Sequence, residues 1–178
     1  RPRGKGGRDH PYEAALLWSL GTAVMSFFGA GVWGFMHTLA PINYYSHGTQ
    51  VTAAHGHLAF FGAYVSINLA IITYAMPYLK QRAPYNQVLN MLSFWLLNSG
   101  MAFMTFTLTF AGVVQTHLQR VQGQAFMDVQ SELGVFYWMR LGAGLVVAVG
   151  AFLFIYATFV PRRKEVIKPA TQLGQAAE

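Results

Sequence analysis

Four long runs of apolar residues, separated by short polar segments, dominate the pattern of this sequence. Residues 14–79 contain no Asp, Glu, Lys or Arg, and neither do residues 83–119. A helix needs about 20 residues to cross the ~30 Å hydrocarbon core of a bilayer, and uncharged runs of this length are typical of transmembrane helices. The pattern predicts an all-α membrane bundle in a single domain over residues 1–178, with four spans at about residues 12–40, 52–79, 86–118 and 133–160.

The composition agrees with a membrane protein and excludes several soluble classes. Of the 178 residues, 54% are hydrophobic and only 10% are charged, whereas a soluble domain carries about 25% charged residues. The absence of cysteine excludes a disulfide scaffold, a zinc–thiolate site and an iron–sulfur cluster. The net charge of +6 comes from basic residues at the ends of apolar runs, which favours contact with anionic lipid headgroups over nucleic acid.

The positions of Lys and Arg predict the orientation of the spans. Four spans place both termini on one side of the membrane, and only Arg120 and Arg140 fall on the other side. Because basic residues are retained on the cytoplasmic side, we expect both termini to be cytoplasmic. The ten basic residues on that side are Arg1, Arg3, Lys5, Arg8, Lys80, Arg82, Arg162, Arg163, Lys164 and Lys168.

Aromatic residues and glycines within the spans predict interfaces and helix contacts. Amphipathic rings concentrate at membrane–water interfaces, so we expect Trp18 at the inner interface and residues 136–138, FYW, at the outer one. Small residues let helices approach closely in membranes. We expect such packing contacts at Gly29, Gly31, Gly34, Gly142 and Gly144.

The histidines are the candidate chemical groups. Five of the six lie at or near the outer ends of the spans: His37, His47, His55, His57 and His117. An ionisable residue within a span is costly and therefore a functional candidate, most often as a ligand of a metal or haem. His55 and His57 lie about one turn inside the second span. We expect the other three to be interfacial, because water and headgroups satisfy an imidazole at a helix end.

The two-residue spacing of His55 and His57 limits what they can bind. At 3.6 residues per turn their side chains are about 200° apart, so they point to opposite faces and cannot chelate one ion. Each could instead ligate a separate flat haem on either side of one helix. The alternative is that both only form interhelical hydrogen bonds. Nearby residues would leave space or offer flat walls for a haem: Gly56, Gly62, Phe60, Phe61 and Tyr64.

Residues 47–64, HGTQVTAAHGHLAFFGAY, resemble the tenth-helix motif in the large subunit of the bacterial nitric oxide reductases, which are members of the haem–copper oxidase superfamily. Four flanking segments are similar to the same subunit: residues 15–19, 27–35, 105–119 and 136–138. The resemblance covers nearly the whole chain. It implies that the four spans correspond to the last four of about twelve helices, and that the chain is the C-terminal part of the large polypeptide.

The resemblance implies a role for each central histidine. His55 would be the proximal ligand of the high-spin haem b3 at the catalytic site, and His57 one axial ligand of the low-spin haem b. The second low-spin ligand and the ligands of a non-haem iron would come from the missing N-terminal helices, so this fragment alone would be inactive.

The resemblance also implies an activity and partners for the complete protein. It would reduce nitric oxide to nitrous oxide in denitrification, as part of the respiratory chain in the bacterial inner membrane. A cytochrome c subunit would be a partner, although the sequence leaves open whether electrons come from cytochrome c or quinol.

Two other functions fit parts of the pattern. The chain could be a self-contained four-helix membrane cytochrome b that transfers electrons, in which His37 and His117 supply the axial ligands opposite His55 and His57. It could also be an oxygen reductase of the same superfamily, which shares the paired histidines. The flanking segments that resemble nitric oxide reductase argue against the oxygen reductase.

Arg120 and Arg140 are candidates for binding the propionates of the haems. The propionates would emerge at the outer level of the membrane, where a guanidinium can bind a carboxylate with two hydrogen bonds. Arg140 is the better candidate because it lies within the fourth span. The alternative is that the two arginines pair with Asp128 or Glu132, which are close in the sequence.

Overall fold

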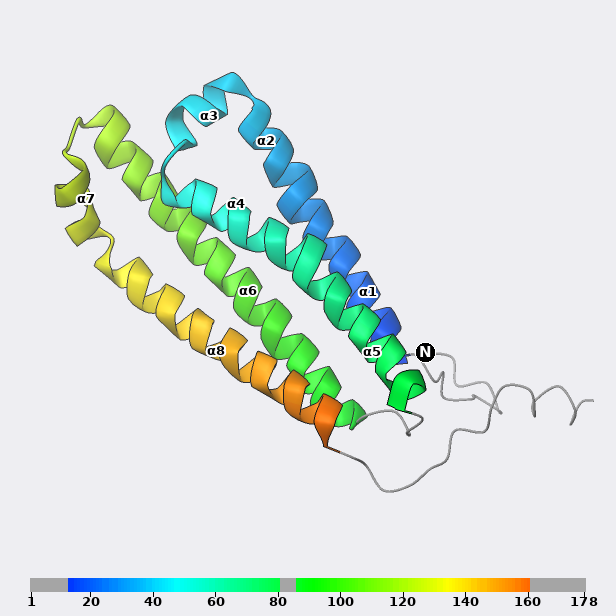
Figure 1. The fold of residues 1–178 in the computed structure, drawn as a ribbon. Coiled ribbons are helices and arrows are strands. Elements are labelled where there is room, and N and C mark those ends of the chain that lie inside the picture. The colour runs from blue at the N-terminus through cyan, green and yellow to red at the C-terminus, as the bar shows by residue number, and fades with distance from the viewer. Residues whose placement is uncertain (1–12, 81–85, 161–178) are drawn as a thin grey trace, which may run out of the picture.

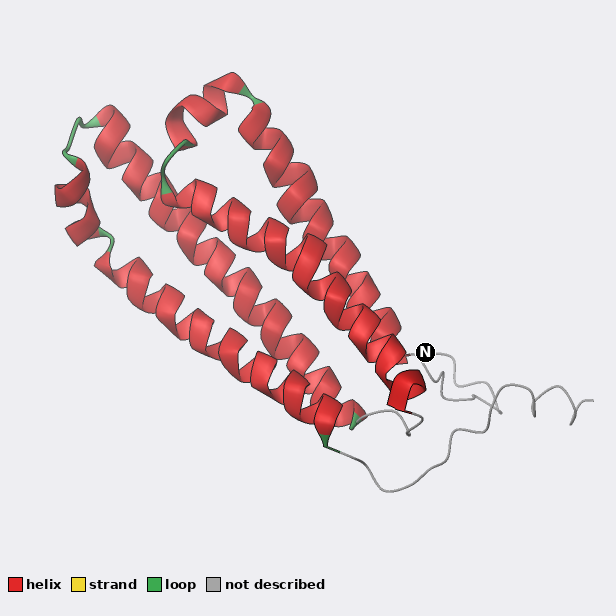
Figure 2. Cartoon of the chain, in the orientation of Figure 1, coloured by secondary structure: helices red, strands yellow, loops and turns green. Residues whose placement is uncertain are grey.

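The structure is a computed structural model that describes residues 13–80 and 86–160. The regular elements in these two ranges are all helices (Figure 2), so the all-α fold class is confirmed. Their bounds are α1 Glu13–Ser26, η1 Phe27–Trp33, α2 Gly34–Thr38, α3 Ala40–Ser46, α4 Gln50–Phe60, η2 Phe61–Ser66, α5 Ile67–Lys80, α6 Gln87–Thr116, η3 His117–Val121, α7 Phe126–Glu132 and α8 Gly134–Phe159. The η segments are π-helical turns that continue the neighbouring α-helices.

Four continuous helical rods are long and apolar enough to cross a membrane, as the sequence predicts. They are Glu13–Thr38, Gln50–Lys80, Gln87–Val121 and Gly134–Phe159. The rods lie side by side as two hairpins, with α3 and α7 at one end and the start of the described chain at the other (Figure 1). We call these the far end and the near end. Nine of the ten basic residues expected on the cytoplasmic side lie outside the described residues, and the exception is Lys80.

The short helices α3 and α7 at the far end were not predicted. Leu39, which follows the first rod, has an extended backbone at φ −78° and ψ 116°. Pro41 then lies in the first turn of α3. Proline is favoured there because its missing N–H has no intrahelical partner at that position. The far-end connections are therefore largely helical rather than irregular.

Helix α6 is the centre of the bundle. In its most apolar stretch 56% of the residues are buried, against 17–33% in the other three rods. It packs on α8, α4 and α1, and its buried side chains include Leu97 and Leu108. The Ser93 hydroxyl also donates a 2.7 Å hydrogen bond to the carbonyl of Gly150 on α8. Packing and interhelical hydrogen bonds of this kind hold helices together in a membrane.

Trp18 lies in the core, so its expected place at the inner interface is wrong. Its side chain is fully buried and makes edge contacts with Phe94 and Phe154, at centroid distances of 5.0 and 5.6 Å. The indole N–H donates a 2.8 Å hydrogen bond to Oδ1 of Asn90. Because a protein partner satisfies this N–H, the ring has no need of interfacial water.

Glycines bring the first two rods into backbone contact. A Cβ at Gly29 would lie 2.7 Å from the backbone of Leu58, and one at Gly62 would lie 2.6 Å from the backbone of Met25. The expected close contact is therefore confirmed at Gly29. The expectation is wrong, within the described residues, at Gly31, Gly142 and Gly144. A Cβ added at any of these three would have no neighbouring atom closer than 3.9 Å.

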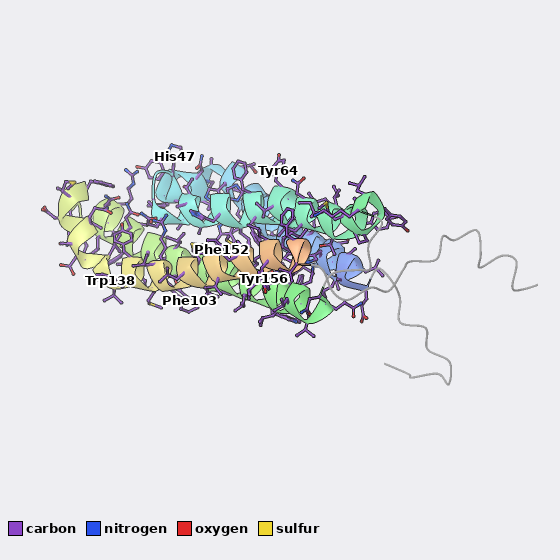
Figure 3. The ribbon with its side chains drawn as sticks, turned by 60° about the horizontal axis from the view of Figure 1, so that its bottom comes forward. His47, Tyr64, Phe103, Trp138, Phe152 and Tyr156 are labelled. Atoms are coloured by element: carbon purple, nitrogen blue, oxygen red, sulfur yellow. The ribbon has the colours of Figure 1, made fainter. Side chains whose placement is uncertain are left out.

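The outer surface of the rods is rich in large apolar side chains. Trp138 and Phe152 on α8 are 74% and 73% exposed, and Figure 3 labels them with Phe103, Tyr156 and Tyr64 around the bundle. An apolar surface this extensive is typical of a protein that contacts lipid. The bundle thus has a packed centre at α6 and an apolar exterior.

Candidate functional site

The start of α4 is fixed to its neighbours just before the two central histidines. The backbone N–H of Gln50 donates a 2.8 Å hydrogen bond to Oε1 of Gln115 on α6. The side-chain amide of Gln50 donates to the hydroxyl of Tyr137 on α8 at 3.3 Å. Gln115 is only 1% exposed, so these bonds lie in a water-poor environment where they are costly to break. The position of His55, five residues later, follows from this anchor.

The His55 imidazole is oriented by a carbonyl on another rod. Its Nδ1 lies 3.0 Å from the carbonyl oxygen of Gly29 in η1. A carbonyl only accepts, so Nδ1 carries the proton and Nε2 presents a lone pair. Nε2 has no hydrogen bond to another described residue. Gly34 lies beside the ring, since a Cβ there would be 3.5 Å from Cε1 of His55.

The His57 imidazole is oriented by its own helix. Its Nδ1 donates a 2.7 Å hydrogen bond to the carbonyl of Ala53, one turn earlier. Its Nε2 is likewise left with a lone pair and has no hydrogen bond to another described residue. Phe60 and Tyr64 follow on the same side of the rod and are 67% and 63% exposed. Their rings lie 5.6 Å apart with planes tilted by 32°, and together they form an exposed aromatic wall on this side of the rod.

The donor set on α4 fits two haem irons better than one metal ion. Both histidines offer Nε2 while a carbonyl holds Nδ1, which is the usual arrangement of a metal-bound imidazole. Within the described residues, no three His, Cys, Asp or Glu side chains form a group that could hold a metal ion. The expectation that Phe61 and Gly62 border a haem is wrong. Phe61 is in the core at 3% exposure, and Gly62 packs against Met25.

His37 lies at a helix end, as expected, but its ring packs against His55, so the expectation that water and headgroups satisfy it is wrong. The two rings are stacked with centroids 4.9 Å apart and planes 24° apart. Nδ1 of His37 donates to the carbonyl of Trp33 at 3.0 Å, and its Nε2 is buried without a hydrogen bond. Axial ligands of one haem point their nitrogens at each other along one axis. The stacked pair does not have this geometry, which argues against the four-helix cytochrome.

The other two far-end histidines are exposed. His47 lies in the connection before α4. His117 begins η3, and its Nε2 lies 3.1 Å from the side-chain amide of Gln122. Within the described residues, neither of them forms a hydrogen bond or a ring contact with His55 or His57.

Arg120 and Arg140 are exposed at the far half of the bundle. Neither forms an ion pair with Asp128 or Glu132, all four residues being within the described part of the chain. The alternative that these charges neutralise each other locally is therefore not found, and both guanidinium groups are available to an anion.

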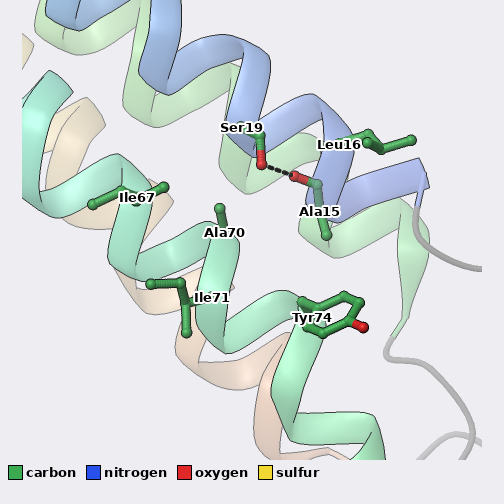
Figure 4. A pocket seen from close by; sticks show the side chains of 7 residues that line it. All are labelled: Ala15, Leu16, Ser19, Ile67, Ala70, Ile71 and Tyr74. Atoms are coloured by element: carbon green, nitrogen blue, oxygen red, sulfur yellow. Dashed lines mark hydrogen bonds between the residues drawn. The ribbon is translucent and has the colours of Figure 1, made fainter.

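Two apolar grooves lie away from the histidines. The first, of about 350 Å³, lies between α1 and α5 near the near end. It is lined by Ala15, Leu16, Ser19, Ile67, Ala70, Ile71 and Tyr74 (Figure 4). The Ser19 hydroxyl there donates to the Ala15 carbonyl of its own helix at 2.9 Å. The second, of about 400 Å³, lies between α6 and α8. Neither groove contains a metal-binding side chain, so the candidate site stays with α4.

The sequence analysis missed the residues that orient the histidines. The sequence predicts only packing for Gly29, although its carbonyl holds His55, and only an interfacial place for Tyr137. It assigns no role to Gln50 or Gln115. An amide or hydroxyl inside a membrane span needs a partner, and this rule could have singled out Gln115. No local pattern pairs His37 with His55, because the two lie on different rods.

Comparisons with known proteins point to one family. A family model described as Cytochrome C and Quinol oxidase polypeptide I matches residues 5–146. A nitric oxide reductase subunit of Stutzerimonas stutzeri is 49% identical over 158 residues, which are 84% of this chain and 33% of that protein. This chain therefore spans about a third of the relative's length.

A solved structure shows the same fold. A heme-copper terminal oxidase dimer determined by cryo-electron microscopy matches 92% of this chain and 29% of its own chain, with a TM-score of 0.68 and 16% identity. At this identity the likeness concerns the fold alone. Because the family model covers most of the sequence, the chain belongs to the cytochrome c and quinol oxidase polypeptide I family of haem–copper oxidases.

Proposed function

We propose that this chain is the haem-binding part of a respiratory nitric oxide reductase catalytic subunit, which reduces nitric oxide to nitrous oxide in denitrification. The observation that carries the proposal is the pair of unbonded Nε2 atoms on opposite faces of α4. The 49% identity to a protein named as a nitric oxide reductase component favours this activity over oxygen reduction.

The two histidines have separate roles in this proposal. His55 is the proximal ligand of the high-spin haem b3, and His57 is one axial ligand of the low-spin haem b. The Gly29 and Ala53 carbonyls hold Nδ1 of the two rings, so that each Nε2 lone pair would be available to a haem iron. When bound, the haems supply one-electron transfer and the iron at which nitric oxide is reduced. Arg140 and Arg120 supply positive charge to the propionates at the far end.

The rest of the catalytic polypeptide completes the site. The described residues hold no three-ligand metal group, so the ligands of a non-haem iron come from other helices of the same polypeptide. The protein spans the bacterial inner membrane with both termini of this chain cytoplasmic, because ten of its twelve basic residues lie, in the sequence, on the terminal side of the spans or in the connection between the second and third. A cytochrome c subunit is the proposed electron-donating partner.

Separate replacement of the two histidines tests the proposal. In the protein expressed from its complete reading frame, His55→Ala should remove the high-spin haem and leave the low-spin one, whereas His57→Ala should do the reverse. The reason is that each substitution removes one iron–nitrogen bond on one face of α4. Haem content and optical spectra of purified protein measure both losses. His47→Ala, at an exposed histidine, is the control and should keep both haems. Removal of the same haem by both substitutions would contradict the assignment.

The 178-residue chain on its own provides a second test. It should bind haem weakly and show no nitric oxide consumption, because the second metal has no ligand group among the described residues. Pyridine haemochrome quantitation and a nitric oxide electrode measure the two properties. Two tightly bound six-coordinate haems without turnover would support the four-helix cytochrome instead, and sustained turnover would refute the need for further helices.

A further inference from the structure

The proposed function leaves the half-buried imidazole of His37 without a role. His37 lies in the last turn of the first rod, and its Nε2 is buried without a hydrogen bond. A buried polar atom left unpaired costs about 1–3 kcal/mol, and an ionisable residue inside a span adds to that cost. A leucine at this position would fill space without an unpaired nitrogen. The ring of His37 must therefore provide something that an aliphatic side chain does not.

The environment of His55 shows what that is. The Gly29 carbonyl holds the Nδ1 edge of its ring at 3.0 Å, and Gly34 lies beside Cε1. One hydrogen bond at one edge still allows the ring to swing about the direction of that bond. The His37 ring covers a face of His55 at 4.9 Å and nearly parallel, at 24°, which blocks this swing.

The π-helical segment explains why these groups converge. Gly29 belongs to η1, and Gly34 and His37 belong to α2, which follows directly. The Gly34 N–H bonds to the Gly31 carbonyl and so does not use the carbonyl of Gly29, which accepts from His55. π-Helical turns are frequent at functional sites because they re-aim backbone and side-chain groups. The carbonyl, the small residue and the ring thus come from one short stretch.

We propose that His37 is a positioning residue for the haem ligand His55. Its ring fixes the plane of the His55 imidazole, so that Nε2 points in one direction toward the iron. His37 is held in turn by its own bond to the Trp33 carbonyl at 3.0 Å. The proposal rests on the proposed function, namely that His55 binds the high-spin haem.

Two substitutions separate stacking from the other properties of His37. His37→Phe keeps a flat ring and removes both nitrogens, whereas His37→Leu keeps volume and removes the ring. Both are made in the haem-loaded protein expressed from its complete reading frame. The readouts are the iron–histidine stretching band of the ferrous high-spin haem in resonance Raman spectra and the midpoint potentials of the two haems.

The expected result is that His37→Leu shifts and broadens the iron–histidine band and shifts the high-spin potential, while the low-spin potential stays unchanged. His37→Phe should match the unmodified protein in both readouts. An unchanged band in His37→Leu would overturn the proposal. Equal changes in both variants would also overturn it, because the nitrogens would then matter and not the ring.

The low-spin haem serves as an internal measure of folding. If His37→Leu does not accumulate with its low-spin haem, His37→Met, whose flexible side chain adapts to irregular space, replaces it in the same comparison. Failure of the proposed function has a different signature: His55→Ala would then retain the high-spin haem, whatever the variants at His37 show.

Discussion

The two sides of α4 carry the same side chain in very different surroundings. On one side, His55 is bound by the carbonyl of Gly29 and stacked by His37, both from the first rod. On the other side, the ring of His57 bonds only to Ala53 of its own helix, and Phe60 and Tyr64 further along the rod are exposed. Residues of a second rod therefore orient His55, whereas the orientation of His57 comes from its own helix.

The difference follows from helix geometry and from the number of rods. Two residues rotate a helix by about 200°, so a single neighbouring rod can cover only one of the two histidines. The first rod covers the side of His55, and α6 takes a third side of α4. The orientation of His55 therefore depends on how the first two rods pack, whereas that of His57 depends on α4 alone. Substitutions can therefore act on one side of α4 at a time.

The largest effect is expected at Gly29, on the side of His55. In Gly29→Ala the new methyl would lie 2.7 Å from the backbone of Leu58, so the first rod must move away and carry the His55 acceptor with it. Overpacking of this kind costs about 1–3 kcal/mol. We expect a lower thermal midpoint and loss of the high-spin haem before the low-spin one.

Gly31→Ala is the matched control for this substitution. It lies in the same π-helical segment, and the nearest atom to its new methyl would be 3.9 Å away. Haem spectra recorded during thermal unfolding of both variants measure the order of loss. Equal loss of the two haems in Gly29→Ala would show that the two sides of α4 are not independent.

The spans and the phase of the two histidines could be predicted because they depend on local properties. An uncharged run longer than about 20 residues has few alternatives to a membrane helix, and a helix fixes the angle between His55 and His57 at any position. Neither statement requires knowledge of a distant residue. The resemblance carried by residues 47–64 added the family, which the comparison confirmed.

The partners of single side chains could not be predicted, because they are distant in the sequence. Trp18 binds Asn90, 72 residues away, so an interfacial tryptophan and a buried one look alike in the sequence. His37 contacts His55 across the far-end connection, and no periodic pattern reports this contact. The π-helical turns have no distinct hydrophobic period, so they too appeared only in the structure.

A smaller effect is expected on the open side of α4. Replacement of both Phe60 and Tyr64 by Ala removes the exposed aromatic wall on the side of His57 and the dispersion contacts it would give a haem. Because the iron–nitrogen bond remains, we expect reduced low-spin haem occupancy rather than complete loss. The ratio of the two haems after purification measures the change.

Phe152→Ala on α8 is the control for the open side. Phe152 is 73% exposed but lies on the other layer of the bundle from Tyr64 (Figure 3). It should leave the haem ratio unchanged. If the double replacement at Phe60 and Tyr64 also left the ratio unchanged, the exposed wall would be a lipid contact and not part of the site.

The smallest effect is expected from Arg140, which is exposed. Tyr137 on α8 bonds to Gln50 on α4, and both helices run from this bond toward the near end. Arg140 is three residues beyond Tyr137, or about 4.5 Å along the axis, and His55 is five residues beyond Gln50, or about 7.5 Å. Arg140 and His55 therefore lie at similar levels along the bundle.

A positive charge at this level stabilises a reduced haem more than an oxidised one, and so raises its midpoint potential. Arg140→Leu should therefore lower the midpoint potential of a haem by about a few tens of millivolts. This is the size expected when one charge is removed and solvent and salt partly screen its effect. Spectroelectrochemical titration measures both potentials, and the one that moves identifies the side of α4 that Arg140 serves. Arg120→Leu, at the end of η3, should change both potentials less because Arg120 lies farther toward the far end. Unchanged potentials in Arg140→Leu would exclude a propionate contact and leave Arg140 as a lipid-facing charge.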